Sequence, residues 1–297
     1  RQGTDTVDKE DWEGTVTETP PPPSPTPRTP AGGAGLAALL TAPERALVAL
    51  DYDGTLAPIV PRPSDAVPAP GAVAALTRIS RHVGAIAIIT GRQVDALLEL
   101  TGLAKVPELD RLLILGQYGL QRWDARTGRT TSPEPLPGVA ELRAALPEVL
   151  RDAPPGTTLE DKEHALVVHV RRTADPDAAL ASLTPLLTRL AEEHGLEAAP
   201  GKRVLELRPP GHDKGRALRE LVTELAARSV LVAGDDYGDL PAFEAVEELR
   251  AKGVGGLTVC SDSPEVPAAL RERADLVVGG PAGMVTLLEV LADRLES

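Results

Sequence analysis

Short apolar runs recur along this chain and end at polar clusters, and this pattern constrains the fold more than any other feature. Ala46–Leu50, Ala85–Ile89 and Val230–Ala233 are such runs, and segments with helical apolar spacing, such as Pro70–His82 and Lys214–Ala227, lie between them. Strands of a parallel sheet have continuous apolar runs because helices cover both faces of the sheet. The chain is therefore predicted to be an α/β protein with a doubly wound, mainly parallel, Rossmann-like core.

The order of the predicted elements changes within residues 121–207. Two predicted helices, Pro137–Arg151 and Pro176–His194, are each followed by two short predicted strands. This helix–strand–strand order, present twice, indicates an α+β unit inserted into the first pattern. We therefore expect a core formed by residues 36–120 and 208–297, with residues 121–207 as an inserted α+β cap domain.

Residues 1–35 differ in composition from the rest of the chain. Thr19–Pro30 contains seven prolines, which favour extended polyproline II and leave little apolar surface for a core. We expect a disordered, proline-rich tail, with a docking segment as the alternative interpretation.

The composition excludes several classes of function. The 297 residues include 44 acidic and 31 basic side chains, for a net charge of −13, and only 2% are aromatic. General nucleic-acid binding needs lysine and arginine, and base stacking needs aromatic rings. No run of about 18 apolar residues predicts a membrane-spanning helix, and the single cysteine, Cys260, excludes a disulfide framework. We expect a soluble, cytoplasmic monomer that binds neither nucleic acid nor membrane.

Two carboxylates follow the first predicted strand, in the segment Asp51–Thr55. Asp51 and Asp53 are two residues apart on an extended segment and point the same way. Crowded carboxylates repel one another unless a cation or a shared proton relieves the repulsion. A pair of solvated turn residues is the alternative interpretation.

Two further polar positions are candidates for binding an anion. Thr90 follows the second predicted strand and precedes Gly91 and Arg92, so its hydroxyl and the nearby backbone amides can donate to an anion, although a helix N-cap has the same pattern. Lys214 opens a predicted helix, where the helix dipole favours anions over cations. This position is understandable if Lys214 faces an anion, and a surface lysine beside a capping Asp213 is the alternative.

Three acids follow the strand Val230–Ala233, namely Asp235, Asp236 and Asp239. Clustered carboxylates at a strand end suit a hard cation such as Mg²⁺, which prefers oxygen ligands. Helix capping by Asp239 is the alternative for that residue.

In this order, the four clusters resemble the signature motifs of the haloacid dehalogenase-like phosphohydrolase superfamily. The resemblance covers the predicted core and implies that this core is catalytic. It implies that Asp51 is the nucleophile that forms an aspartyl phosphate, and that Asp53 protonates the leaving oxygen and then activates water. Thr90 is implied to hold the phosphoryl oxygens, and Lys214 to neutralise their charge.

The same resemblance implies Mg²⁺ as the cofactor. Its expected protein ligands are Asp51, the backbone carbonyl of Asp53, and Asp235, with Asp236 or Asp239 in support.

A narrower resemblance is to the family of trehalose-6-phosphate phosphatases. It implies that Glu160, Lys162 and Glu206 of the cap contact the disaccharide, and that Gly91 and Arg92 of the core also bind substrate. The chain departs from the family pattern at Gly238, Leu240 and Val170, where the family commonly has Thr, Glu and Tyr. The segments that carry this resemblance are 50–59, 116–120, 159–162, 169–171, 205–209 and 212–215.

The expected activity is therefore Mg²⁺-dependent hydrolysis of a small-molecule sugar phosphate, trehalose 6-phosphate, to trehalose and phosphate. A phosphatase for another sugar phosphate, such as sucrose phosphate or a glycosyl phosphoglycerate, is the first alternative. A non-catalytic sugar-phosphate-binding regulator and a phosphomutase are the others.

Overall fold

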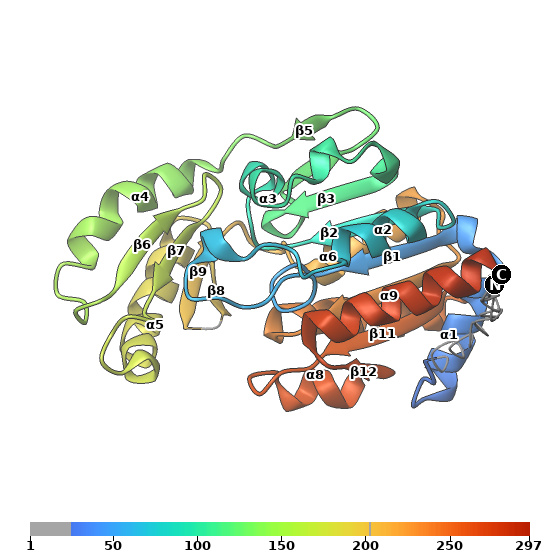
Figure 1. Ribbon diagram of the computed structural model, residues 1–297. Helices are drawn as coiled ribbons and strands as arrows, with labels where there is room; N and C mark the ends of the chain where they lie inside the picture. The colour runs from blue at the N-terminus through green and yellow to red at the C-terminus, as the bar shows by residue number, and fades with distance from the viewer. Residues whose placement is uncertain (1–24, 202) are drawn as a thin grey trace, which may run out of the picture.

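Two β-sheets and the helices around them form the protein (Figure 1). The computed structural model describes residues 25–201 and 203–297. The larger sheet has eight strands in the order β12-β11-β10-β1-β2-β3-β4-β5. Its first six strands in this order are parallel, and β4 and β5 are antiparallel. The strands are β1 (Ala46–Leu50), β2 (Ala85–Ile89), β3 (Leu112–Gly116), β4 (Gln121–Asp124), β5 (Arg129–Thr131), β10 (Ser229–Gly234), β11 (Gly255–Ser261) and β12 (Leu276–Val278).

Helices cover both faces of the large sheet, which confirms the predicted α/β fold. Successive side chains of a strand point to opposite faces, and on β1 Val48 and Leu50 enter one core cluster while Leu47 and Ala49 enter the other. The first cluster includes α1 (Pro30–Thr41), α2 (Ala72–Ser80), α3 (Val94–Thr101) and α9 (Gly280–Glu296), and the second includes α6 (Lys214–Glu224), α7 (Leu240–Ala251) and α8 (Ala268–Arg273).

The smaller sheet has the strand order β6-β7-β9-β8 and is antiparallel throughout. The predicted helix–strand–strand order is present twice, and the two helices pack against one face of the sheet. We call this unit, residues 137–208, the cap; in Figure 1 it lies at one end of the large sheet. Its elements are α4 (Pro137–Val149), β6 (Thr158–Asp161), β7 (Leu166–His169), α5 (Pro176–Glu193), β8 (Glu197–Gly201) and β9 (Val204–Arg208).

The expected boundary between core and cap needs correction. The sequence pattern places it after residue 120, but β4 pairs with β3 and β5 pairs with β4, so the large sheet continues to Thr131. These two strands are short and mostly polar, and Trp123 is the side chain of β4 that enters the core. A continuous apolar run is therefore missing from this hairpin, and the sequence pattern does not reveal it.

The expected tail also ends earlier than residue 35, because α1 begins at Pro30. The hydroxyl of Thr29 caps this helix by accepting from the amide of Gly32. A Cβ at Gly35 would lie 1.7 Å from the carbonyl oxygen of Gly256, so this glycine lets the helix approach β11 closely. Residues 1–24 of the expected tail lie outside the described residues.

No helix in residues 25–201 or 203–297 combines the length and apolar character needed to cross a membrane.

Candidate active site

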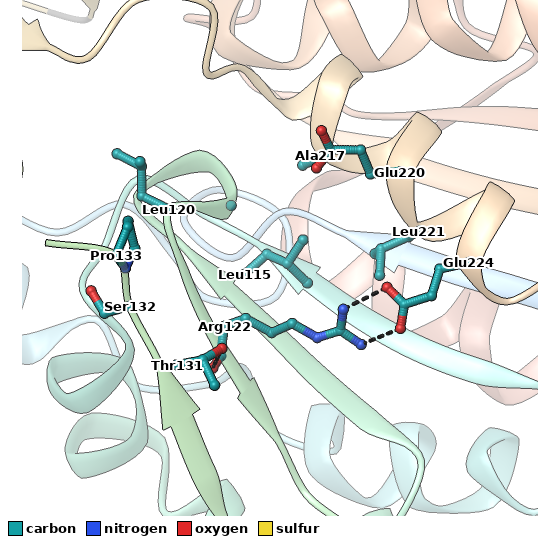
Figure 2. A pocket seen from close by; sticks show the side chains of 11 residues that line it. Leu115, Leu120, Arg122, Thr131, Ser132, Pro133, Ala217, Glu220, Leu221 and Glu224 are labelled. Carbon is teal, nitrogen blue, oxygen red and sulfur yellow. Dashed lines mark hydrogen bonds and ion pairs between the residues drawn. The ribbon is translucent and has the colours of Figure 1, made fainter.

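Two cavities flank the loop that follows β3. One, of about 380 Å³, lies between β4 and α6, where Arg122 and Glu224 form a two-bond ion pair (Figure 2). It contains none of the predicted site residues. The other, of about 310 Å³, is the candidate active site because core and cap residues with the predicted chemistry line it, together with an apolar wall that includes Ile59 and Pro63. Its polar lining residues are Asp51, Asp53, Thr90, Arg92, Gln93, Tyr118, Glu160, Lys162, His169, Arg171, Lys214, Asp235 and Asp236.

The parallel pairing of β1 with β10 brings the first and last acidic clusters together. Leu50 is in register with Ala233, and the amide of Asp51 donates to the Ala233 carbonyl at 2.9 Å. Because the strands run in the same direction, Asp51 and Asp235 leave the sheet at the same edge. Gly54 allows this close approach, since a Cβ there would lie 2.1 Å from a carboxylate oxygen of Asp235.

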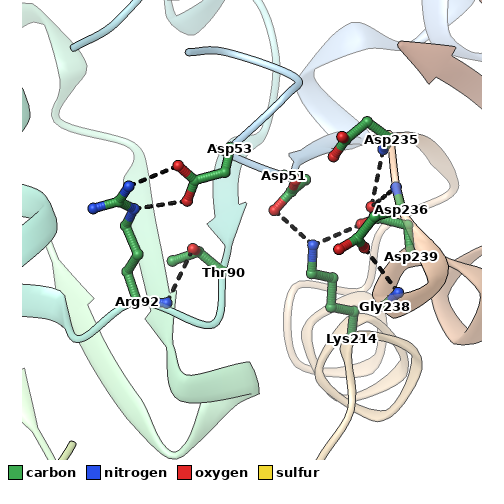
Figure 3. Close-up of polar contacts among 9 residues, drawn as sticks. All are labelled: Asp51, Asp53, Thr90, Arg92, Lys214, Asp235, Asp236, Gly238 and Asp239. Atoms are coloured by element: carbon green, nitrogen blue, oxygen red, sulfur yellow. Dashed lines mark hydrogen bonds and ion pairs between the residues drawn. The ribbon is translucent and has the colours of Figure 1, made fainter. Parts of the chain in front are cut away.

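Lys214 lies between two buried carboxylates (Figure 3). Its Nζ donates to Oδ1 of Asp51 at 2.6 Å and to Oδ1 of Asp239 at 2.7 Å. Asp213 caps α6 by accepting from the amide of Arg216 at 2.7 Å. The lysine at this helix N-terminus therefore faces anions, as the sequence suggested.

The acidic cluster carries more negative charge than Lys214 offsets. Burial raises the pKa of Asp51, Lys214 lowers it, and the charges of Asp239, Asp235 and Asp236 raise it further. Burial, and next the charges of Asp239 and Asp236, raise the pKa of Asp235 to about 8. Carboxylate oxygens of Asp51, Asp235 and Asp239 lie within 4.8 Å of one another. A hard, oxygen-binding cation fits this donor set.

Asp239 and Asp236 have different surroundings. Oδ2 of Asp239 accepts from the amides of Asp235 and Asp236, at 3.0 and 3.1 Å. Oδ1 of Asp236 accepts from the amide of Gly238 at 2.8 Å and caps the short helix η6 (Tyr237–Asp239). The structure thus brings Asp239, rather than Asp236, into the set of three carboxylates, while Asp236 lines the cavity.

Asp53 points toward Arg92 and away from Lys214 (Figure 3). The guanidinium donates to both carboxylate oxygens of Asp53, at 2.6 and 2.7 Å. Thr90 is buried, and its hydroxyl accepts from the amide of Arg92 at 3.2 Å. Thr90 and Arg92 therefore share one wall of the cavity with Asp53, whereas Lys214 lies on the side of Asp51.

The strand register of the cap places its predicted residues on one face. Glu160 is opposite Val167, which is opposite Glu206, so these three side chains lie on the same side of the sheet. The opposite side packs on α4 and α5. The open face of the cap therefore looks toward the core site.

Lys162 connects this face to the core. Its Nζ donates to the carbonyl oxygen of Gly91 at 3.2 Å and contacts Oε1 of Glu206 at 3.5 Å. Glu160 bonds Nε2 of His169 at 2.7 Å, and this hydrogen bond is the main reason that the pKa of Glu160 is lowered. The three predicted cap residues thus meet Gly91 and Arg92 around one cavity, although Glu206 itself is buried behind its lining.

Sequence reasoning did not include three residues among its predicted site residues. Tyr118, His169 and Arg171 also line the cavity. Tyr118 belongs to the short segment after β3, and the other two come from β7 and the residues after it. All three lie in the segments 116–120 and 169–171, which carry the resemblance to the trehalose-6-phosphate phosphatases, so these motifs were the signal that could have found them.

Comparisons with known proteins agree with this geometry. The family model for trehalose-phosphatase matches residues 49–275. An uncharacterized glycosyl hydrolase of Mycobacterium tuberculosis is 32% identical over 71% of this chain and 16% of its own length. A trehalose-phosphate phosphatase of Mycolicibacterium paratuberculosis is 30% identical over 84% of this chain and 62% of its own length.

The chain thus spans less than two thirds of the length of either of these relatives. Among solved structures, the C-terminal domain of Candida albicans trehalose-6-phosphate phosphatase has a TM-score of 0.73 and 22% identity, covering 91% of this chain and 99% of that one. That likeness shows the same fold. Because the family model matches most of its length, this chain belongs to the trehalose-phosphatase family.

Proposed function

We propose that this protein is a phosphatase that hydrolyses trehalose 6-phosphate to trehalose and phosphate through an aspartyl phosphate on Asp51. The observation that carries the proposal is the contact of Asp51 with Lys214 inside a cavity that core and cap share. Membership of the trehalose-phosphatase family supports the substrate.

In the first step, a carboxylate oxygen of Asp51 attacks phosphorus, and the bond from phosphorus to the sugar oxygen breaks. Lys214 offsets part of the negative charge on the carboxylate and the phosphoryl group. The Thr90 hydroxyl and the amides beside it can donate to the phosphoryl oxygens.

Asp53 is the proposed acid and base. As a carboxylic acid it gives its proton to the leaving sugar oxygen, and as a carboxylate it then takes a proton from the water that attacks phosphorus. That attack breaks the acyl–phosphate bond, releases phosphate and restores Asp51. Because Arg92 occupies both oxygens of Asp53 in this structure, the pair must open before Asp53 acts.

Mg²⁺ is the proposed cofactor. Asp51 and Asp235, with the backbone carbonyl of Asp53, would hold it, and Asp239 or Asp236 would support these ligands. Burial first, and then the charges of the neighbouring carboxylates, raise the pKa values of Asp51 and Asp235, and a divalent cation would offset both effects. When bound, the ion supplies positive charge that stabilises the phosphoryl oxygens.

The cap is the proposed sugar-binding region. Glu160, Lys162 and Glu206 offer carboxylate acceptors and an ammonium donor near the cavity, and these groups suit the hydroxyls of a disaccharide. The division into a catalytic core and a substrate-selecting cap is part of this proposal, and the expected monomeric state and cytoplasmic location remain predictions.

Phosphate release from a panel of sugar phosphates tests the proposal, with and without Mg²⁺. We expect trehalose 6-phosphate to be hydrolysed with the highest kcat/KM, and only with the metal present. Faster hydrolysis of sucrose phosphate or of a glycosyl phosphoglycerate would reassign the substrate. Binding without turnover of any member would favour the regulator, and transfer of phosphate to a second sugar hydroxyl would favour the phosphomutase.

A further inference from the structure

The short segment after β3 has an unusual backbone. Gln117, Tyr118 and Gly119, which form η5, have φ values of 47°, 58° and 97°. Positive φ is unfavourable for a bulky side chain and persists where the surrounding structure imposes it. The strain at Tyr118 therefore indicates a position fixed by its neighbours.

On one side, this segment is bonded to the phosphate-binding residues of the core. The amide of Gln117 donates to the carbonyl of Arg92 at 2.9 Å, and the amide of Tyr118 donates to the carbonyl of Thr90 at 3.0 Å. The phenol oxygen of Tyr118 lies 2.7 Å from the position that a Cβ at Gly91 would take. The tyrosine ring therefore packs directly on the backbone of Gly91.

On the other side, the same ring contacts the cap. The guanidinium carbon of Arg208, at the end of β9, lies 4.6 Å from the centre of the Tyr118 ring, within the range of a cation–π contact. Arg208 also donates to Glu197 at 3.0 Å and lies 4.0 Å from Glu206. The ring thus separates the phosphate-binding residues from the strand that carries Glu206.

A second contact joins η5 to the residue that follows β6, which is an edge strand of the cap sheet. The side-chain amide of Gln117 donates to the carbonyl of Lys162 at 2.6 Å, and the ammonium of Lys162 reaches back to the carbonyl of Gly91 at 3.2 Å. Residues at two places on the cap sheet, Lys162 after β6 and Arg208 at the end of β9, therefore both contact η5.

We propose that Tyr118 is a positioning residue whose ring, held between Gly91 and Arg208, sets the position of the cap relative to the phosphate-binding residues. The inference rests on the proposed function, since it concerns how a sugar bound by the cap is placed against a phosphate bound by the core. The cavity then has two half-sites: the cap residues that bind the sugar and the core residues that bind the phosphate. Loss of the Tyr118 ring removes the spacer between these two half-sites. Contacts to the sugar then weaken, whereas contacts to the phosphate remain with Thr90 and Lys214.

The test measures trehalose formation from trehalose 6-phosphate, with inorganic phosphate as a competing inhibitor. The variants are Tyr118→Leu, Tyr118→Phe, Arg208→Gln and the double variant Tyr118→Leu/Arg208→Gln. Arg122→Gln is the matched control, because it removes an arginine ion pair beside the other cavity. The KM for the sugar phosphate reports both half-sites, and the inhibition constant of phosphate reports the core half-site alone.

We expect Tyr118→Leu and Arg208→Gln each to raise KM by about tenfold, with kcat within about threefold of the original chain and the inhibition constant of phosphate within about twofold. The rise in KM of the double variant should be smaller than the product of the two single effects, because both substitutions remove the cation–π contact, although Arg208→Gln also removes the pair with Glu197. Tyr118→Phe, which keeps the ring, and Arg122→Gln should stay close to the original chain.

Three outcomes would each overturn the inference. The KM of Arg208→Gln could be unchanged, or the rise in KM of the double variant could equal the product of the two single effects. The third is a rise in the inhibition constant of phosphate that is proportional to the rise in KM. If thermal unfolding shows that Tyr118→Leu does not fold, Arg208→Gln and Tyr118→Phe still decide it, because they leave most of the packing in place. If the original chain prefers another sugar phosphate, all variants are assayed with that substrate instead. If the original chain hydrolyses no sugar phosphate, the proposed function is wrong, and the inference about Tyr118, which rests on that function, is wrong as well.

Discussion

The core and the cap contribute different kinds of side chain to one cavity. Asp51, Lys214 and Asp239 of the core have at most 7% of their side-chain surface exposed. On the cap, the Glu160 side chain is 49% exposed and its partner His169 is 32% exposed, and only Glu206 among the predicted sugar-binding residues is buried. The core groups extend from buried parallel strands or sit at a helix N-terminus, whereas every residue of β6 is exposed.

This difference in exposure fits the proposed division, in which the core performs the chemistry and the cap recognises the substrate. Charges that are removed from water interact strongly and are costly to leave unpaired. Exposed pairs are screened and are worth little individually. We therefore expect substitutions in the core to change the rate by orders of magnitude, and substitutions in the cap to change substrate affinity by smaller factors.

The largest expected effect comes from Asp51→Asn. An amide cannot act as the nucleophile, and it leaves the buried Lys214 with one carboxylate partner fewer. We expect kcat for trehalose 6-phosphate to fall by at least about a thousandfold, which equals about 4 kcal/mol of transition-state stabilisation. Phosphate release under single-turnover conditions measures this.

Asp110→Asn is the control, because it makes the same chemical change at an exposed loop position. It should keep full activity. If Asp51→Asn retained more than about a tenth of the activity, the covalent route through this residue would be wrong, and the contrast between core and cap would lose its basis.

Metal removal is the second way to test the core. Chelation should abolish turnover, and Mg²⁺ should restore it.

Removal of the metal should also change how the stability of the protein depends on pH, because folding raises the pKa of Asp235 from 3.8 to about 8. A carboxyl with a raised pKa stabilises the fold below the pKa of the unfolded chain, and this contribution is lost as the pH rises through about 8.

The melting temperature of the metal-free protein should therefore fall between about pH 6 and pH 9. A bound cation replaces the proton as the source of compensation, so Mg²⁺ should raise the melting temperature more at about pH 9 than at about pH 6. Asp235→Asn should flatten the pH dependence of the metal-free protein. An equal effect of Mg²⁺ at both pH values would contradict this account of the cluster.

The sequence was more informative about the core than about the cap or the contacts between them. Strands such as β1, β2 and β10 were predictable because continuous apolar runs identify buried parallel strands. The polar ends of parallel strands meet at one edge of a sheet, so the proximity of Asp51 and Asp235 was predictable as well. The polar hairpin β4–β5 and the glycine-rich start of α1 lack that signal and were missed.

Side-chain partners were the least predictable part of the site. Asp236 and Asp239 are three residues apart, and only the capping turn decides which of them joins the carboxylate cluster. The pairing of Asp53 with Arg92 and the position of Tyr118 depend on rotamers and on strained backbone, for which a sequence period carries no information.

Glu206→Gln tests the cap and should have an intermediate effect. Glu206 is buried and contacts Lys162, so the neutral amide weakens both this pair and the proposed acceptor for sugar hydroxyls. We expect KM for trehalose 6-phosphate to rise by about ten- to a hundredfold, corresponding to about 1–3 kcal/mol, with a much smaller change in kcat.

Glu141→Gln on α4 is the control, because it alters a carboxylate of the cap that pairs with His194 outside the cavity. It should leave KM unchanged. A loss in kcat for Glu206→Gln comparable with that of Asp51→Asn would mean that the cap takes part in the chemistry itself.

The smallest expected effect is on stability, in Glu160→Gln. The hydrogen bond from His169 is the first cause of the lowered pKa of Glu160. A carboxyl with a lowered pKa stabilises the fold above the pKa of the unfolded chain, near 4.5, and this contribution disappears as the pH falls through the lower folded value. Because both side chains are partly exposed, we expect a loss of less than about 1 kcal/mol at neutral pH.

Urea unfolding at about pH 7 and again below about pH 4 measures this loss, with the exposed Glu193→Gln on α5 as the control. The difference from the original chain should vanish in acid. If Glu160→Gln instead lost more than about 2 kcal/mol at neutral pH, the cap face would behave like a buried ionic cluster. Chemistry and recognition would then be built from the same kind of interaction, and the distinction between core and cap would be one of position alone.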